Sequence, residues 1–304
     1  MKMRRILCLA VAILMVTLMA ASCGGKKSDY IVLDEIFATE DYALGFRKGD
    51  NALTLKVQEI LDEMIKDGKA AEISNKWFGE DKILKNQSFP GTIDDGSDSS
   101  LDDLMARGTL ILGLDVGFAP MGFYDENGEY GPTGDIVGID IDLAREVCKR
   151  LGVTLKLQPI EWAAKEMELN AGNIDVIWNG MSVTQERIEA MNISKPYLKN
   201  RMVVIAKADA GIKKLADLSG KIVGVQAGSS AIDAINSKPD IAASFANLAE
   251  YDTNTMAFLE LKIGRIDALV VDEVVGLNLI ERFGAIEETE AEVAEDVDVE
   301  EEEG

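Results

Sequence analysis

The sequence lacks histidine entirely and has only three cysteines among its 304 residues. Without histidine, the side chain that most often acts as a general base or a metal ligand near neutral pH is missing. The remaining acids and cysteines show no metal-ligand spacing, and the chain has no cofactor loop and no nucleophile paired with a base. We therefore expect no bound metal, no cofactor and no catalytic residues.

Positive charge is also scarce, because 31 Lys and Arg stand against 54 Asp and Glu, for a formal net charge of −23. Residues 285–304 alone contain eleven acids and no base. Such a segment cannot bury enough apolar surface to fold, so we predict an acidic disordered tail there. The rest of the chain has no basic stripe, which argues against nucleic acid as a partner.

Residues 1–22 have the pattern of a lipoprotein signal peptide. Basic residues near the start precede the apolar run Ile6–Met19, which is too short for a comfortable membrane span. The small residues before Cys23 resemble the bacterial lipoprotein box, although Ala20 stands where that box usually has Leu. We expect Cys23 to carry the lipid anchor. The alternative is ordinary signal cleavage with a free Cys23, and in either case Cys148 is expected in the core.

Strand and helix patterns alternate in two series, one from Leu101 to about residue 198 and one from Ile222 to Phe283. This alternation predicts an α/β fold with two lobes and mainly parallel sheets. Ahead of both series, residues 30–84 contain two extended pieces followed by two helix patterns. Residues 85–100 are a linker by composition.

One segment has the pattern of an anion receptor. A buried strand (173–177) is followed by a tight turn at Gly180 and a helix that Thr184 can cap. Free backbone N–H groups at that turn, with Ser182 and Arg187 nearby, would hold a small carboxylate. The alternative is an ordinary strand–helix turn with a solvated arginine.

A second receptor of the same kind lies in the other series, where Gly228, Ser229 and Ser230 lead into a helix. Asp272 follows the strand 268–271, at the sheet edge where ligand groups gather, and suits an ammonium group. Its other possible role is to cap the following helix, and both roles are compatible.

Three further residues are candidates for contacts with a ligand side chain. Asp115 also ends a strand, and the aromatic residues Phe118 and Trp162 are placed to line a cleft between the lobes. The alternative role for each aromatic ring is plain core packing.

An ordered set of motifs between residues 101 and 284 resembles the solute-binding proteins of polar amino acid ABC transporters (family 3 type). The motifs are GLDVGFAP (113–120), GIDIDLA (138–144), NGMSVTQER (179–187), VGVQAGSS (223–230) and GRIDA (264–268). The resemblance implies a two-lobed periplasmic-binding-protein fold of type II.

The resemblance also implies roles for individual residues. Arg187 and Ser182, helped by Ser229 and Ser230, would hold the α-carboxylate of an amino acid. Asp272 and the carbonyl of Gly180 would take the α-ammonium. Asp115, Phe118 and Trp162 would meet the ligand side chain, for which we expect a polar or cationic group.

The order of segments departs from the family pattern, because the part resembling residues 30–84 comes last in the family and first here. The chain therefore resembles a circular permutant, with the old termini joined by 85–100. The predicted lobe 1 is 42–84 with 101–198, and the predicted lobe 2 is 30–41 with 199–284. The alternative is that 30–84 forms a separate helical module.

These observations predict an extracytoplasmic binding protein, anchored to the cell membrane through Cys23, on the cell surface or in a periplasm. It would capture a free amino acid between two lobes as a monomer and deliver it to an ABC permease. The main alternative is a dehydratase-like enzyme of the same fold, with Asp115, Glu161 or Asp272 as acid or base. A sensory module is a weaker alternative, since no signalling domain follows residue 284.

Overall fold

The computed structural model describes residues 28–284. The predictions for the signal segment 1–22, for Cys23 and for the tail 285–304 lie outside the described residues. Between residues 28 and 284, none of the helices combines the length and the apolar character needed to cross a membrane.

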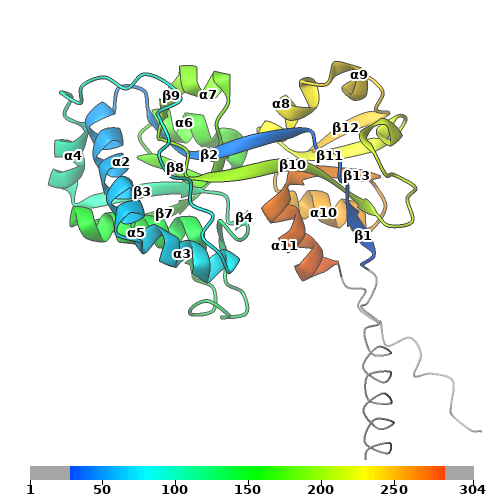
Figure 1. The fold of residues 1–304 in the computed structure, drawn as a ribbon, viewed down its shortest axis with the longest axis horizontal. Helices are drawn as coiled ribbons and strands as arrows, with labels where there is room; N and C mark the ends of the chain where they lie inside the picture. The colour runs from blue at the N-terminus through cyan, green and yellow to red at the C-terminus, as the bar shows by residue number, and fades with distance from the viewer. Residues whose placement is uncertain (1–27, 285–304) are drawn as a thin grey trace, which may run out of the picture.

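The described chain forms two α/β bodies joined by two long strands, β2 (Ala38–Arg47) and β10 (Leu198–Lys207) (Figure 1). The first body contains α2 (Asn51–Lys66), α3 (Lys69–Phe78), α4 (Ser100–Arg107), β3 (Thr109–Leu114), β4 (Gly117–Phe118), β5 (Gly122–Tyr124), β6 (Ile136–Val137), α5 (Ile139–Leu151), β7 (Thr154–Pro159), η1 (Trp162–Ala164), α6 (Lys165–Asn170), β8 (Val176–Ser182), α7 (Gln185–Ala190) and β9 (Met191–Ile193). The second body contains β1 (Tyr30–Val32), η2 (Leu215–Leu218), β11 (Ile222–Gln226), α8 (Ser230–Asn236), α9 (Pro239–Ala242), β12 (Asn247–Tyr251), α10 (Asn254–Lys262), β13 (Ala268–Asp272) and α11 (Glu273–Phe283).

The sheets of the two bodies are continuous with each other. A ten-stranded sheet runs in the order β12-β11-β13-β10-β2-β8-β3-β7, with β1 paired to β10 and β9 paired to β2. The β11–β12, β11–β13, β3–β7 and β3–β8 pairs are parallel. The predicted mainly parallel sheets are nevertheless wrong, because β10 pairs antiparallel with β1, β2 and β13, and β2 pairs antiparallel with β8 and β9. The connecting strands β2 and β10 pair antiparallel in the middle, from Leu198↔Tyr42 to Met202↔Ala38. Because β1 and β2 belong to this sheet, residues 30–84 do not form a separate helical module.

Hydrophobic periodicity explains why the main elements form where they do. In α2, Leu53, Val57, Leu61 and Met64 recur at helical spacing and are all buried. Each such side chain contributes about 1.5–3 kcal/mol when it leaves water. In β13 every residue is buried, as expected for a strand paired on both sides, with β11 and β10, inside the sheet. Cys148 lies buried in α5, as predicted.

The predicted tight turn at Gly180 is wrong, because β8 continues through it to Ser182. Gly180 has φ +58° and lies in the part of β8 where the register with β2 shifts. A Cβ at this position would approach Phe118 Cε1 to 2.7 Å, so both the conformation and the space require glycine. The glycine therefore kinks the strand instead of ending it.

A side chain organises the connection between β5 and β6. The strands that pair are β5 and β6, and residues 125–135 connect them. The Asp125 carboxylate accepts hydrogen bonds from the backbone N–H groups of Glu129, Tyr130 and Gly131. A side chain thus supplies the acceptors that a two-residue turn would take from the backbone.

Candidate functional site

The predicted site residues gather where the two bodies meet. β8 and α7 of the first body carry Ser182 and Arg187, while the start of α8 and the end of β13 carry Ser230 and Asp272. All four are at most 5% exposed, although none is an apolar residue. Burial of so many polar groups is costly unless they are paired, so their partners define what the site can do.

Arg187 is a buried cation whose partners are neutral. Its Nη1 donates to the Ser182 carbonyl oxygen at 2.7 Å and its Nη2 donates to the Gly228 carbonyl oxygen at 3.3 Å. Thr184 caps α7 as predicted, accepting a hydrogen bond from the Arg187 backbone N–H at 3.2 Å. Among residues 28–284, no carboxylate forms an ion pair with Arg187. Burial lowers the pKa of this guanidinium, partly offset by acids farther away. A buried guanidinium in this setting is suited to pair with an anion.

Asp272 is a buried acid at the same junction. Its Oδ1 accepts hydrogen bonds from the Tyr42 hydroxyl at 2.7 Å and from Asn200 Nδ2 at 2.6 Å. Its side chain does not cap α11, so the alternative capping role is not realised. Burial, followed by the nearby Glu40 carboxylate, raises the pKa of Asp272 to about 7. A cation beside it would restore the charged form.

Phe118 and Trp162 lie as a parallel pair. Their ring centroids are 6.5 Å apart with planes inclined by only 9°, and both rings are buried. The Lys165 ammonium lies 5.1 Å from the centroid of the Trp162 ring. This centroid distance lies within the range of about 4.5–7 Å found for offset-stacked aromatic rings. The pair therefore fits core packing as well as contact with a ligand.

Asp115 joins the two bodies. Its carboxylate accepts hydrogen bonds from Gln226 Nε2 in the second body and from the Gly117 backbone N–H, both at 2.7 Å. Burial raises the pKa of this acid, partly offset by these hydrogen bonds. Next to it lies a cavity of about 360 Å³ whose lining includes Asp115, Glu161 and Trp162 from the first body and Asp252 from the second.

The bodies are also linked through Gly228. Its carbonyl oxygen accepts hydrogen bonds from Arg187 and, at 2.9 Å, from Lys165 Nζ. Gly228 has φ +66°, and a Cβ there would come within 2.9 Å of the Ala163 Cα. This glycine therefore permits close approach of the two bodies.

Two of the predicted residues have partners that the sequence did not indicate. The Gly180 backbone N–H is not free, because it donates to the buried Asp140 carboxylate at 2.7 Å. The Ser229 hydroxyl donates within its own turn, to the Gln226 carbonyl oxygen at 2.7 Å. The predicted free N–H at Gly180 is therefore wrong, while the Gly180 carbonyl stays a candidate acceptor.

Sequence reasoning missed Glu40, Tyr42, Asn200 and Gln226. Alternation along β2 places Glu40 and Tyr42 on one face, and Glu40 is the direct cross-strand partner of Asn200. Gln226 ends a parallel strand, the same signal that singled out Asp115. The sequence alone does not place these residues in the site, because that requires knowing that β2 pairs with β10.

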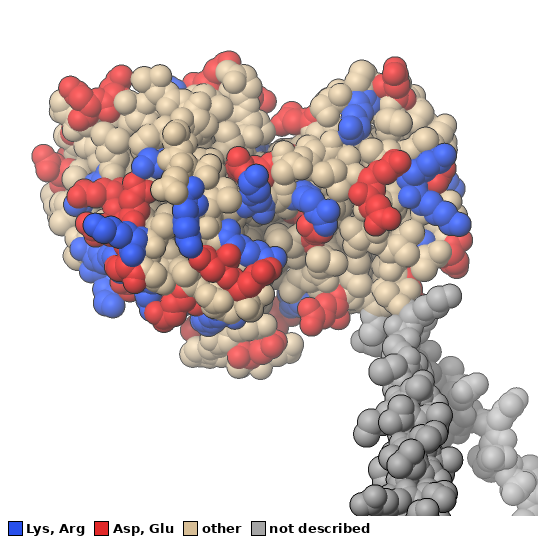
Figure 2. All heavy atoms as spheres, viewed as in Figure 1, with Lys and Arg blue, Asp and Glu red and all other residues tan. Residues whose placement is uncertain are grey.

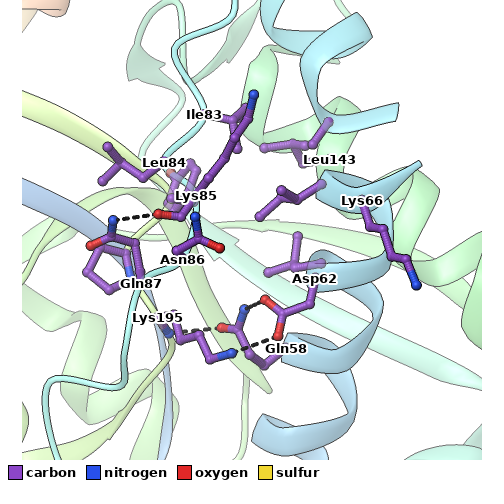
Figure 3. Close-up of a pocket in the computed structure, with 15 residues that line it drawn as sticks. Gln58, Asp62, Lys66, Ile83, Leu84, Lys85, Asn86, Gln87, Leu143 and Lys195 are labelled. Atoms are coloured by element: carbon purple, nitrogen blue, oxygen red, sulfur yellow. Dashed lines mark hydrogen bonds and ion pairs between the residues drawn. The ribbon is translucent and has the colours of Figure 1, made fainter. Parts of the chain in front are cut away.

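The structure also contains a crevice away from this site. It has a volume of about 430 Å³ and lies between α2 and the segment 83–87 (Figure 3). Asp62 accepts hydrogen bonds from Gln58 Nε2 at 2.9 Å and from Lys195 Nζ at 2.7 Å, and Gln58 Oε1 accepts the Lys195 backbone N–H. None of the predicted site residues lines it.

Neither the distribution of surface charge nor the potential metal ligands indicate a further site among the described residues. On the face drawn in Figure 2, acidic and basic side chains are interspersed over both bodies. Within residues 28–284, no three potential metal ligands come together.

Two α/β bodies joined by two strands, with buried opposite charges at their junction, define a two-lobed binding protein of type II. The model of the family described as bacterial extracellular solute-binding proteins, family 3, matches residues 10–80 and 110–297. The chain belongs to this family.

Individual relatives support the assignment. Over 184 residues the chain is 29% identical to the L-cystine-binding protein TcyJ of Escherichia coli K12, which covers 60% of this chain and 65% of that protein. It is 29% identical over 187 residues to the arginine-binding extracellular protein ArtP of Bacillus subtilis, covering 61% and 67%. A Streptococcus pneumoniae ABC uptake transporter substrate-binding protein with bound histidine is similar in structure, with TM-score 0.58, 37% identity, and 62% and 76% coverage. The chain thus spans just under two thirds of the length of TcyJ.

Proposed function

We propose that this protein captures a free amino acid between its two bodies and delivers it to an ABC permease. The observation that carries the proposal is the buried Arg187, which has no anionic partner among the described residues and lies close enough to the buried Asp272 for their charges to interact. A zwitterion supplies both missing charges, a carboxylate for the guanidinium and an ammonium for the acid. Ser182 and the loop residues Ser229 and Ser230 assist at the carboxylate, and the Gly180 carbonyl assists at the ammonium.

The side-chain end of the site favours a cationic amino acid. The rings of Phe118 and Trp162 offer aromatic faces beside which a cationic group can be held. The adjoining cavity is lined by Asp115, Glu161 and Asp252 and by no basic residue. Arginine and histidine, the ligands named for two of the similar proteins, have flat cationic or ionisable groups.

The protein works outside the cytoplasm, held at the membrane by a lipid on Cys23, as a monomer. The family description places its members outside the cell, and the box before Cys23 supports the anchor. Lobe 1 consists of 42–84 with 101–198, and lobe 2 of 30–41 with 199–284. Ligand closes the cleft by rotation about β2 and β10, because only the closed form brings both charged ends into contact.

The chain is a circular permutant of the family. Three observations support this. β1 and β2 lie within the shared sheet, Asp29 and Gly284 line one cavity, and the relatives' alignments cover about 60% of the chain. A cut between 284 and 29, with the old ends joined by 85–100, accounts for all three.

A thermal-shift screen against the twenty amino acids tests the function. Ligand at a hundredfold excess over Kd adds about 2.7 kcal/mol of stability. For a protein of this size, that raises the melting temperature by on the order of 5–10 °C. We expect arginine, lysine or histidine to give the largest shift. If none of the twenty shifts the transition, the function is wrong.

The dehydratase alternative is separated by recovery of the ligand. A binding protein returns the amino acid unchanged and in stoichiometric amount after incubation, whereas an enzyme returns product. Chromatography of the released ligand distinguishes the two.

A further inference from the structure

Glu40 brings a carboxylate of the protein itself into the site. Its Oε2 accepts hydrogen bonds from the Ser182 hydroxyl at 2.6 Å and the Ser230 hydroxyl at 3.0 Å, and lies 3.4 Å from Asn200 Nδ2. Ser182 belongs to the first body and Ser230 to the second, while Glu40 lies on the connecting strand β2. One carboxylate oxygen therefore bridges both bodies.

The two hydroxyls that Glu40 occupies are the ones assigned above to the ligand carboxylate. Each hydroxyl has a single proton to donate, so it cannot serve two carboxylate oxygens at once. A ligand carboxylate at Arg187 would also lie close to Glu40, and like charges in a buried site repel strongly. Ligand and Glu40 thus compete for the same donors.

We propose that Glu40 is an internal competitor for the ligand carboxylate and thereby determines the affinity of the site. This inference rests on the proposed function. Whenever the bodies close without ligand, Glu40 connects Ser182 with Ser230. When an amino acid enters, its carboxylate takes over the two hydroxyls, and the partly exposed Glu40 side chain turns away from them. Because of this competition, the affinity for an amino acid is lower than the same hydroxyl donors would give without Glu40.

The opposite role would be a second acid for the ligand ammonium, beside Asp272. The donors argue against it, because two hydroxyls from different bodies already point at Glu40 as they would at a bound anion. The two roles predict opposite effects of neutralising this residue.

The variant Glu40→Gln keeps the shape of the side chain and removes its charge. We expect its affinity for arginine to rise about tenfold in a calorimetric titration, since charge-assisted hydrogen bonds no longer compete. Asp41→Asn is the matched control. Asp41 is next on the same strand, faces the other way by alternation, and makes no side-chain hydrogen bond within residues 28–284. Its affinity should stay within about twofold of the wild type.

A second ligand separates competition from a general change in the cleft. Agmatine is arginine without the carboxylate, so it does not compete for the hydroxyls. Glu40→Gln should therefore leave agmatine binding unchanged or weaken it, while arginine binding improves. Histidine with histamine forms a second pair for the same comparison.

The outcomes are distinct. Unchanged or weaker arginine and histidine binding in Glu40→Gln, with wild-type binding intact, overturns the competitor role and leaves the proposed function standing. Equal gains for an amino acid and its amine overturn it as well. If neither protein binds any amino acid, the proposed function fails and the inference fails with it. Circular dichroism and thermal unfolding of both variants establish that they are folded.

Discussion

The most informative residues of this protein are buried charges that lack a charged partner. Within residues 28–284, the Arg187 guanidinium donates only to carbonyl oxygens, and the Asp272 carboxylate accepts only from a hydroxyl and an amide. A buried charge is costly unless an opposite charge pairs with it. The proposed zwitterion would supply both opposite charges.

Replacing Arg187 by alanine should abolish binding. Loss of one partner of a buried charge pair costs about 2–5 kcal/mol of binding free energy. This loss is measured by calorimetric titration with the amino acid that gives the largest shift in the thermal screen. Arg265→Ala is the matched control, because Arg265 is exposed and pairs with Glu260, and neither is a predicted site residue. An Arg187→Ala protein that binds with intact affinity would end the assignment of this site.

Binding should strengthen as the pH rises through neutrality. Burial raises the pKa of Asp272 to about 7, so folding of the ligand-free protein favours its protonated form. Its contribution to stability is complete below its ordinary pKa of 3.8 and is lost as the pH rises through about 7. The ligand ammonium instead needs the ionised acid. We expect roughly a tenfold gain in affinity between pH 6 and pH 7.5.

The control for this pH dependence is Asp272→Asn, which should bind weakly and with little change over the same range. Lys165, whose pKa burial lowers to about 8, stays mostly protonated below pH 7.5. A wild-type affinity that is flat with pH would contradict the role of Asp272.

At the scale of elements, the loop before α8 decides how closely the bodies approach. Gly228→Ala should lower ligand affinity, because the added Cβ meets the Ala163 backbone only when the bodies are closed. Strain from the positive φ contributes about 1 kcal/mol in any state. Gly211→Ala controls for that strain, since Gly211 has φ +73° and open space around its Cβ.

We expect both glycine variants to lose similar thermal stability without ligand, and only Gly228→Ala to lose affinity by about tenfold or more. Titration calorimetry and melting curves of the two variants make the comparison. Equal affinity in both would mean that the closed approach at Gly228 is unimportant for binding.

The helices and strands themselves were largely predictable. The bounds of α2, α5, β3, β7, β11 and α11 follow directly from apolar periodicity and the residues that end it. The prediction of a tight turn at Gly180 was wrong because a glycine at positive φ suits both a turn and a kinked strand. The pairing partner β2, far away in sequence, decides between them.

At the scale of the whole molecule, the proposed circular permutation can be tested by rearranging the chain. We predict that a chain rearranged to run from residue 101 to 284, then through a short flexible linker into 29–84, folds and binds as the wild type does. Asp29 and Gly284 line one cavity, so a short linker spans them. Circular dichroism and calorimetry should give the same fold and an affinity within about threefold.

The matched control for the rearrangement opens the chain within α5 instead, where a cut breaks a buried helix. That protein should not fold. If the chain opened at 85–100 also fails to fold, the circular permutation is wrong. If it folds and binds, the same two bodies form in either chain order, as a circular permutation requires.

The sequence by itself determined the alternation of elements, the family, and the charged residues Arg187, Asp272 and Asp115, because each depends on neighbours along the chain. Only the tertiary structure decided which groups meet them. Tyr42 and Asp272 are 230 positions apart, and Glu40 and Ser182 are 142 apart. Their contacts depend on the antiparallel pairing of β2 with β10 and β8, which places residues of both bodies next to each other in one sheet. Local pattern is set by short-range sterics and burial, whereas a site between two bodies is set by how the sheet joins them.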